Sequence, residues 1–273
     1  HAARALAMLD AMPDPDPFVT CLALQALVAS DLLRGNGFRR AEADRAIALE
    51  PCAPAPRVAA RPSAAMGAWL AWVDELDAAR DVLEATRRTA EAEGDHSSMP
   101  YALSHLPLLE LRAGDWARAR AVATECLELA ERTGQAFQRA QAQYLLGTVD
   151  AHEGEVDVAR ERLGETLAAG EAAGEEWTVR VAHSALGFTE LCAGDPAAAL
   201  PHLRTAEDIR RRLGVRDPGQ RRETLNLVEA LAELGRPDEA VPLLEEVERD
   251  AAALDRPACL PEDLTIAEHA LWC

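Results

Sequence analysis

The side chains that commonly perform catalysis occur in this chain, but not in catalytic arrangements. Among the seven histidines, His96 and His105 are nine residues apart, and His183 and His202 lie on different predicted helices. A zinc site needs ligands that converge on the metal at about 2 Å. A nucleophile such as Ser104 needs a partnered histidine and acid. The spacing offers neither arrangement, so we expect no metal site, no cofactor and no enzymatic activity.

All 28 basic residues are arginines, because lysine does not occur in the sequence. A lysine Schiff base and the phosphate-binding lysine of a P-loop are therefore excluded within this chain. The 47 acidic residues give a formal net charge of −19. This charge opposes binding to nucleic acids and to anionic membranes. We expect no direct nucleic-acid binding by this segment and no membrane association.

One stretch concentrates the arginines, between residues 210 and 222. Its members are Arg210, Arg211, Arg212, Arg216, Arg221 and Arg222. The cluster suits an anion or an acidic partner at a helix–helix turn. Alternatively, the cations stabilise a helix C-terminus and pair with Glu207, Asp208 and Asp217. We prefer this second, structural interpretation.

The six cysteines are scattered and form no C-x-x-C pair. Cys126 and Cys192 fall inside predicted amphipathic helices, where a thiol serves as a small apolar filler. Isolated free thiols are typical of a reducing compartment. The sequence also shows no signal-peptide pattern and no apolar run of about 18 residues. We therefore expect a cytoplasmic protein.

The elements that position these side chains are marked by glycines at a fixed period. Glycine adopts left-handed backbone angles without a Cβ penalty, so it ends helices well. One set of periodic glycines is Gly114, Gly154, Gly194 and Gly235, and a second set, half a period away, is Gly94, Gly134, Gly174 and Gly214. Asp115, Glu155 and Asp195 follow the first set and are placed to cap the next helix. A period of about 40 residues predicts a stacked array of helix pairs.

A second repeating pattern predicts how the two helices of each pair pack. A marker residue, glycine in three of five units, stands twelve residues before an alanine. The pairs are Gly67 with Ala79, Pro107 with Ala119, Gly147 with Ala159, Gly187 with Ala199, and Val228 with Ala240. Leu163, Leu203 and Leu244 follow the last three alanines by four residues. Small residues let two helix backbones approach, and the leucine fills the groove between them.

Apolar residues recur at helical spacing, and no strand pattern competes with them. We expect an all-α, right-handed α-solenoid of antiparallel helix pairs with a 40-residue repeat. The expected helices span about 1–12, 17–34, 38–50, 57–73, 76–93, 97–112, 115–133, 136–153, 155–173, 176–193, 196–213, 218–234, 237–254 and 262–272. The three prolines in 51–56 favour an extended linker.

This pattern suggests three parts. Residues 1–56 are expected to be degenerate N-terminal repeats or a differently angled cap, because the glycine period is irregular there. Residues 57–260 form the repeat array. Residues 261–273 are the truncated helix of a further repeat, which suggests a segment of a longer polypeptide.

The Gly-x₁₁-Ala spacing, with leucine four residues later, resembles the tetratricopeptide repeat (TPR). The unit is longer than the family's, and it lacks the family's systematic tryptophan and late proline. HEAT-type repeats match the length better but lack this register. The block 111–119, the all-arginine composition and the long unit resemble the helical-repeat region of large actinobacterial LuxR-type transcriptional regulators. That resemblance, over 57–260, implies an ATP-binding domain upstream and a helix-turn-helix domain downstream.

The TPR resemblance also implies a binding surface, because the first helix of each TPR pair lines the concave face. The candidate residues on that face are Arg61, Tyr101, Ser104, Gln141, Tyr144, Thr148, Ser184, Phe188, Arg222 and Glu229. Tyrosine and arginine are favoured binding anchors. The alternative is that Tyr101 and Tyr144 pack between neighbouring units. For Trp69, Trp72 and Trp116, we expect structural packing.

These observations favour a binding function. The preferred hypothesis is the sensor and relay region of a LuxR-type regulator, with a peptide segment of a protein or a small effector in the concave groove. A TPR scaffold without a switching role is the main alternative, a helical-repeat enzyme subunit is a further one, and a homodimer is left open.

Overall fold

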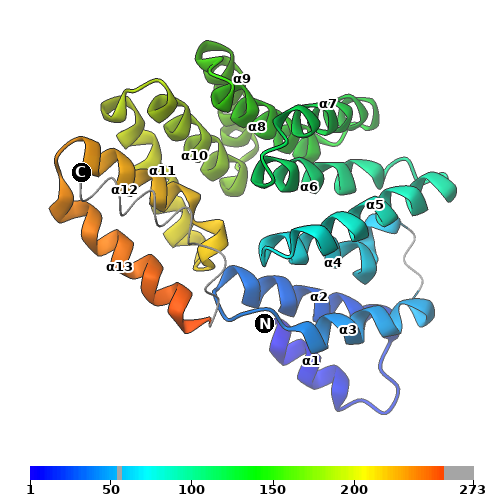
Figure 1. The fold of residues 1–273 in the computed structure, drawn as a ribbon. Helices are drawn as coiled ribbons and strands as arrows, with labels where there is room; N and C mark the ends of the chain where they lie inside the picture. Colours follow the sequence, from blue (N-terminus) through cyan, green and yellow to red (C-terminus); the bar gives the residue numbers. More distant parts are fainter. Residues whose placement is uncertain (54–56, 255–273) are drawn as a thin grey trace.

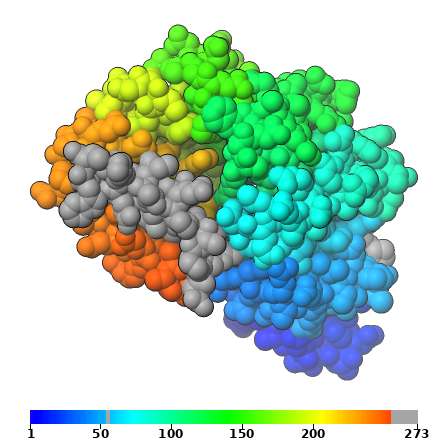
Figure 2. Space-filling model, in the orientation of Figure 1, coloured from blue at the N-terminus to red at the C-terminus, as the bar shows by residue number. Residues whose placement is uncertain are grey.

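The computed structural model describes residues 1–53 and 57–254. Antiparallel helix pairs follow one another around a curved array (Figure 1), and the repeats surround a hollow (Figure 2). The α-helices are α1 (Ala2–Asp10), α2 (Pro17–Leu33), α3 (Arg40–Leu49), α4 (Pro62–Trp72), α5 (Leu76–Ala92), α6 (Met99–Arg112), α7 (Trp116–Thr133), α8 (Ala136–His152), α9 (Val156–Ala173), α10 (Glu176–Cys192), α11 (Pro196–Leu213), α12 (Arg222–Glu233) and α13 (Pro237–Ala253). The described residues contain no strand, and the predicted all-α solenoid is confirmed.

The periodic glycines end the helices, as their spacing predicts. Gly134, Gly174 and Gly214 adopt left-handed angles at the ends of α7, α9 and α11, with φ of 67°, 69° and 69°. Asp115 and Asp195 cap the following helices by accepting hydrogen bonds from backbone N–H groups three residues ahead. Glu155 makes no such bond. Its capping prediction was wrong, because short side chains such as Asp suit this geometry.

Asp74 takes the place of a glycine in the repeat, since it lies one full period before Gly114. It has φ of 66° and is the only non-glycine residue with positive φ in the described chain. Aspartate tolerates this left-handed conformation better than most residues do. The period therefore extends one unit further towards the N-terminus than the glycines alone indicate.

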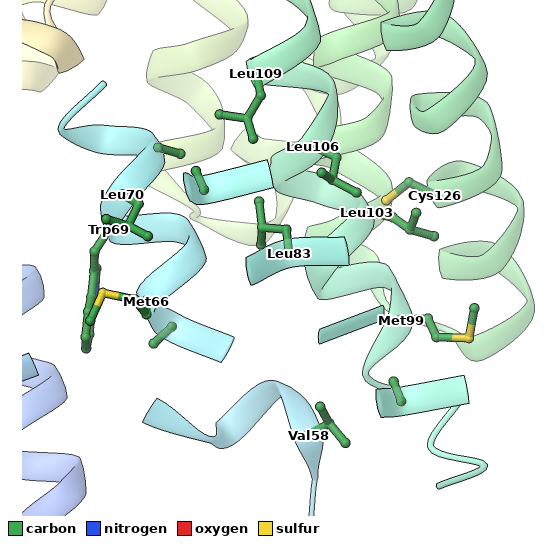
Figure 3. Packing of buried hydrophobic residues seen from close by; sticks show 14 of the residues in the cluster. Val58, Met66, Trp69, Leu70, Leu83, Met99, Leu103, Leu106, Leu109 and Cys126 are labelled. Carbon is green, nitrogen blue, oxygen red and sulfur yellow. The ribbon is translucent and has the colours of Figure 1, made fainter. Parts of the chain in front are cut away.

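Close packing within the helix pairs follows the glycine-to-alanine register. A Cβ built on Gly147 would lie 2.7 Å from Leu163 Cγ, and one on Gly187 would lie 2.4 Å from Leu203 Cγ. These leucines are fully buried, as are the alanines of the register. In the first array unit, Leu83 has the same role between Leu70 of α4 and Leu103 of α6 (Figure 3). The predicted packing is confirmed in these units.

The array closes on itself. The loop between α11 and α12 (residues 214–221) reaches back to the end of α2, where Leu33 O accepts bonds from the N–H groups of Arg216 and Asp217 at 2.7 and 3.2 Å. Gly35 also packs there, since a Cβ on it would lie 3.3 Å from Arg216 Cβ. In Figure 1 the end of α2 accordingly lies beside the loop that leads into α12. We call these contacts the closing contact.

Differences from the expected elements are confined to the ends of helices. The expected helices 57–73 and 218–234 each begin with a separate 3₁₀ turn, Val58–Ala60 and Pro218–Gln220. Glu50–Cys52 is also a 3₁₀ turn rather than an extended linker, since proline suits a first turn. The expected helix 262–272, and with it the truncated repeat 261–273, lies outside the described residues.

Candidate functional site

A cavity of about 550 Å³ lies on the inner side of the array. Helices α4, α6, α8, α10 and α12 contribute to its wall, together with the loop 214–221. The lining residues are Trp72, Asp74, Leu76, Leu108, Leu111, Arg112, Tyr144, Arg180, Val181, Ser184, Pro218, Gly219, Gln220, Arg222, Glu223 and Leu225. Residues from units far apart in sequence therefore surround one space. Its volume is typical of small-ligand sites.

Arg112 joins the two sides of this cavity. Its guanidinium donates to Ala71 O at 2.8 Å and to Gly219 O at 3.2 Å. It also forms an ion pair with Asp74 at 3.3 Å. Since Gly219 belongs to the loop 214–221, Arg112 of α6 holds that loop against the end of α4.

A second arginine forms a buried pair in the wall. Arg180 of α10 donates to Glu223 of α12 at 2.7–2.8 Å, and the two side chains are only 4% and 2% exposed. Arg180 also donates to Gln220 O. Burial raises the pKa of Glu223, and the nearby Arg180 opposes this shift. Removing either partner would leave the other buried without compensation.

Three rings and a guanidinium group form a row of contacts, one from each of four successive units. Trp116 stacks on His152 with ring centroids 5.2 Å apart, and His152 lies 4.6 Å from Phe188. The guanidinium of Arg222 lies 6.0 Å from the Phe188 ring. Burial, followed by the charge of Arg222, lowers the pKa of His152. We call this row the aromatic ladder; it ends at Arg222, in the cavity wall.

Three of the ten candidate residues line the cavity. Tyr144 of α8, Ser184 of α10 and Arg222 of α12 come from three successive first helices. Phe188 does not line the cavity itself, but its ring contacts Arg222, which does. These placements agree with the register implied by the TPR resemblance. Their role in binding stays a prediction.

The other candidates lie outside the cavity lining. Arg61 pairs with Glu93 at 2.5 Å. Tyr101 packs edge-on against His105 at 5.0 Å, and burial raises its pKa to about 12. The hydroxyls of Ser104 and Thr148 donate to carbonyls of their own helices. Gln141 is half-buried on α8. Glu229 is half-buried on α12, and burial raises its pKa.

The arginine cluster between residues 210 and 222 forms ion pairs at every member except Arg222, for which the described residues provide none. Its buried members are Arg210, which pairs with Glu207 at 2.6 Å, and Arg221, which lies between Glu246 and Asp250 at 2.8 Å. Burial by itself would raise the pKa of Glu207. Hydrogen bonds from Arg210, Thr224 and Arg211, together with the charge of Arg210, outweigh this effect and lower the pKa to about 2. The structural interpretation holds for these arginines, although most of their partners come from α13 rather than from Asp208.

Sequence reasoning missed Arg112, Arg180, Gln220 and Glu223 as wall residues. Their positions depend on the return of the loop 214–221 to the N-terminal half, which no local pattern reveals. Trp69 is buried in the core and Trp72 packs against the same core cluster, as expected, but the half-buried Trp72 also lines the cavity. The one signal in the sequence was Asp74 itself, which stands at a glycine position of the repeat and adopts left-handed angles in the structure.

Two other expectations need correction. His183 of α10 and His202 of α11 lie on different helices, yet their Nδ1 atoms are 2.9 Å apart. Cys192 is exposed rather than buried, whereas Cys126 is buried as predicted. For Trp116, by contrast, the expected structural packing is present, because the ring stacks on His152 although it is 39% exposed. In each case the spacing placed the residue on a helix correctly but did not define its neighbours.

Within residues 1–53 and 57–254, no group of three or more His, Cys, Asp or Glu side chains is arranged to hold a metal ion. In that same part of the chain, every helix is too short or too polar to cross a bilayer.

The sequence matches no protein-family model and no curated protein. Among solved structures, the chain is similar to Rap protein complexed with Competence and Sporulation Factor (TM-score 0.70, 13% identity, 92% of this chain and 70% of that chain). It is also similar to BtubC (BKLC) from P. vanneervenii (TM-score 0.53, 19% identity, 85% and 92% of the two chains). A kinesin light chain with TPR-like repeats from Podosopora anserina has a TM-score of 0.45 and 18% identity, over 70% of this chain and 94% of that chain. At these identities the similarity defines the fold alone: the chain has the TPR-like helical-repeat fold.

Proposed function

We propose that this chain is a binding module whose inner cavity takes a short peptide segment or a small effector. The observation that supports it best is the cavity wall, which combines five first helices with the loop 214–221. A ligand there contacts the early and late units at once. Ligand binding therefore stabilises the closing contact, so an occupied cavity favours the closed form of the array.

The structural neighbours are compatible with this proposal. The similar Rap protein holds Competence and Sporulation Factor in its complex, and we extend ligand binding to this chain on the strength of its own cavity. We propose further that the module is the sensor and relay region of a LuxR-type transcriptional regulator in the cytoplasm. This extension rests on the repeat style of the block 111–119. A P-loop domain encoded upstream and a helix-turn-helix domain downstream would support it.

The test of cavity binding is a filling substitution. Val181 lines the cavity, so Val181→Trp should occupy the space that a ligand needs. Val241, 42% exposed on α13, provides the matched control Val241→Trp. Ligands are first selected on the wild-type protein from a random peptide display library and from a metabolite thermal-shift screen. Their affinities for both variants are then measured by calorimetry.

We expect Val181→Trp to weaken selected ligands by about 10-fold or more, because filling the cavity removes their contact surface. Val241→Trp should bind them as the wild type does. Equal binding by all three proteins would contradict the proposal, provided that circular dichroism shows them all to be folded. Failure of both screens to yield any ligand would also contradict it.

The second candidate function is a scaffold that docks a protein segment without switching. The exposed ring of Trp116 at the far end of the aromatic ladder favours it, because exposed aromatic residues are common interface anchors. The two functions differ in one measurable respect. A relay changes its radius of gyration in small-angle X-ray scattering when ligand is added, whereas a rigid scaffold does not.

A further inference from the structure

The cavity has an unbalanced charge. Three guanidinium groups and two carboxylates belong to its lining. Asp74 pairs with Arg112 at 3.3 Å, and Glu223 pairs with Arg180 at 2.7 Å. Arg222 remains, and no carboxylate of the described residues lies within ion-pair distance of it. A net positive cavity is notable in a chain with a formal charge of −19.

The surroundings of Arg222 position it without neutralising it. Its guanidinium lies against the Phe188 ring, which is a favourable cation–π contact. The next group of the ladder, His152, has its pKa lowered by burial and by Arg222. Glu229 lies two turns further along α12, outside ion-pair distance of Arg222, and burial raises its pKa. The exposed Arg222 side chain therefore contacts a ring on one side and has no carboxylate partner among the described residues.

Hydrogen-bond donors near Arg222 also lack acceptors. Gln220 lines the cavity, and its buried Nε2 has no hydrogen-bond partner among the described residues. Asn226, one turn after Arg222 on α12, is 8% exposed, and its Nδ2 likewise has no partner within that part of the chain. Buried donors are rarely left unpaired. Asn226 lies outside the cavity lining, so only the Gln220 donor shares the cavity with Arg222, and both groups call for acceptor oxygens.

The rest of the wall is largely apolar. Leu108, Leu111, Val181 and Leu225 line the same cavity, and Tyr144 adds a ring with a polar end. Such surfaces bury aliphatic groups favourably. The wall thus combines two ion pairs, one guanidinium without a carboxylate partner and several apolar side chains, a combination that suits an amphipathic ligand.

We propose that the ligand of this cavity has an apolar body and a single carboxylate, and that Arg222 binds the carboxylate. This inference rests on the proposed function, because it assumes that the cavity is the binding site. A guanidinium matches the planar, two-oxygen geometry of a carboxylate better than a point charge does. Two sources share this chemistry: the C-terminus of an apolar peptide and a free fatty acid.

The test compares four probes that differ in the head group or in the body. Decanoate and N-acetyl-trileucine have a carboxylate, whereas decanol and N-acetyl-trileucine amide are their neutral counterparts. Binding is measured by calorimetry and by displacement of 8-anilinonaphthalene-1-sulfonate, at low and high salt. The variants are Arg222→Gln and Arg222→Lys, with Arg212→Gln as the matched control. Arg212 is exposed, pairs with Glu176 at 2.9 Å and lies outside the cavity lining, so its loss changes the net charge equally.

We expect at least one carboxylate probe to bind with an affinity about 10-fold higher, or more, than that of its neutral counterpart. The reason is that only the carboxylate can form a charge-assisted hydrogen bond with Arg222. Arg222→Gln should abolish that preference, Arg222→Lys should restore part of it, and Arg212→Gln should leave it unchanged. The better of the two acids identifies the source.

Equal binding of acids and neutral counterparts, or an unchanged preference in Arg222→Gln, would overturn the inference. No binding by any of the four probes would overturn it too. Val181→Trp separates this failure from that of the proposed function. If Val181→Trp blocks acids and neutral probes alike while Arg222→Gln does not, the cavity binds ligands but does not select an anion. If Val181→Trp changes nothing, the cavity is not the site.

Discussion

Burial lowers the pKa of several histidines in this fold. The clearest is His105 of α6, whose pKa falls to about 4 and whose ring packs edge-on against Tyr101. His183 and His202 show the same direction, with burial as the largest cause. Their Nδ1 contact at 2.9 Å also needs one ring to accept a hydrogen bond from the N–H of the other. These side chains are therefore held in the neutral form, as parts of the helix packing.

Acidification should destabilise the protein before its carboxylates begin to titrate. The unfolded chain binds protons on these histidines near pH 6.5, whereas the folded chain does not, so stability falls as the pH drops below 6.5. For His105 alone, the loss between pH 7.5 and 5.5 is about 1 kcal/mol. Urea unfolding at the two pH values measures it. His105→Phe should reduce the difference by that amount, and an unchanged difference would contradict the assignment.

At the scale of the helix pair, a glycine on the first helix fits against a leucine on the second. Gly187 and Leu203 form the tightest example, because a Cβ on Gly187 would lie 2.4 Å from Leu203 Cγ. Gly164 of α9 is a contrasting case, since a Cβ added to it would meet nothing within 4 Å and its backbone is helical. Replacing glycine by alanine should therefore change the free energy of unfolding in opposite directions at the two sites.

Gly187→Ala should lower the free energy of unfolding by about 1–3 kcal/mol, because the packed interface has no space for a methyl group. Gly164→Ala should raise it by about 0.5–1 kcal/mol through helix propensity. Chemical denaturation of both variants and the wild type provides the comparison. A stabilising Gly187→Ala would show that the two helices separate easily and that the register does not set their distance.

The helix pairs were predictable because local spacing determines them. The 40-residue period defined the turns, and the glycine-to-alanine register defined the face on which Tyr144, Ser184 and Arg222 lie. The opposite wall of the cavity was not predictable in this way. Arg112 and Gly219 meet there only because the loop 214–221 reaches α2 and α6, and the contact between residues so distant in sequence leaves no periodic trace.

At the scale of the whole molecule, the closing contact distinguishes this array from an open solenoid. It depends on Gly35, whose φ is +69° and which leaves no room for a side chain beside Arg216. Gly94 has the same φ, but nothing lies within 4 Å of its Cβ position. A pair of identical substitutions therefore separates loss of closure from backbone strain.

Gly35→Val should open the array and increase its radius of gyration, because the valine side chain clashes with Arg216 and strains the turn. Gly94→Val introduces the same strain without the clash, so its radius of gyration should match that of the wild type. Small-angle X-ray scattering of the monomeric proteins measures both. Equal radii for Gly35→Val and Gly94→Val would mean that the contact at Leu33 does not hold the array closed.

In an open repeat array, each unit is stabilised only by contacts with its neighbours, so the two ends can unfold independently. Here the backbone bonds from Arg216 and Asp217 to Leu33 join the ends directly. Local unfolding of α2 should thus destabilise α12 directly, without unfolding of the intervening repeats. Amide hydrogen exchange would detect this cooperativity as a shared opening free energy for the first and last pairs.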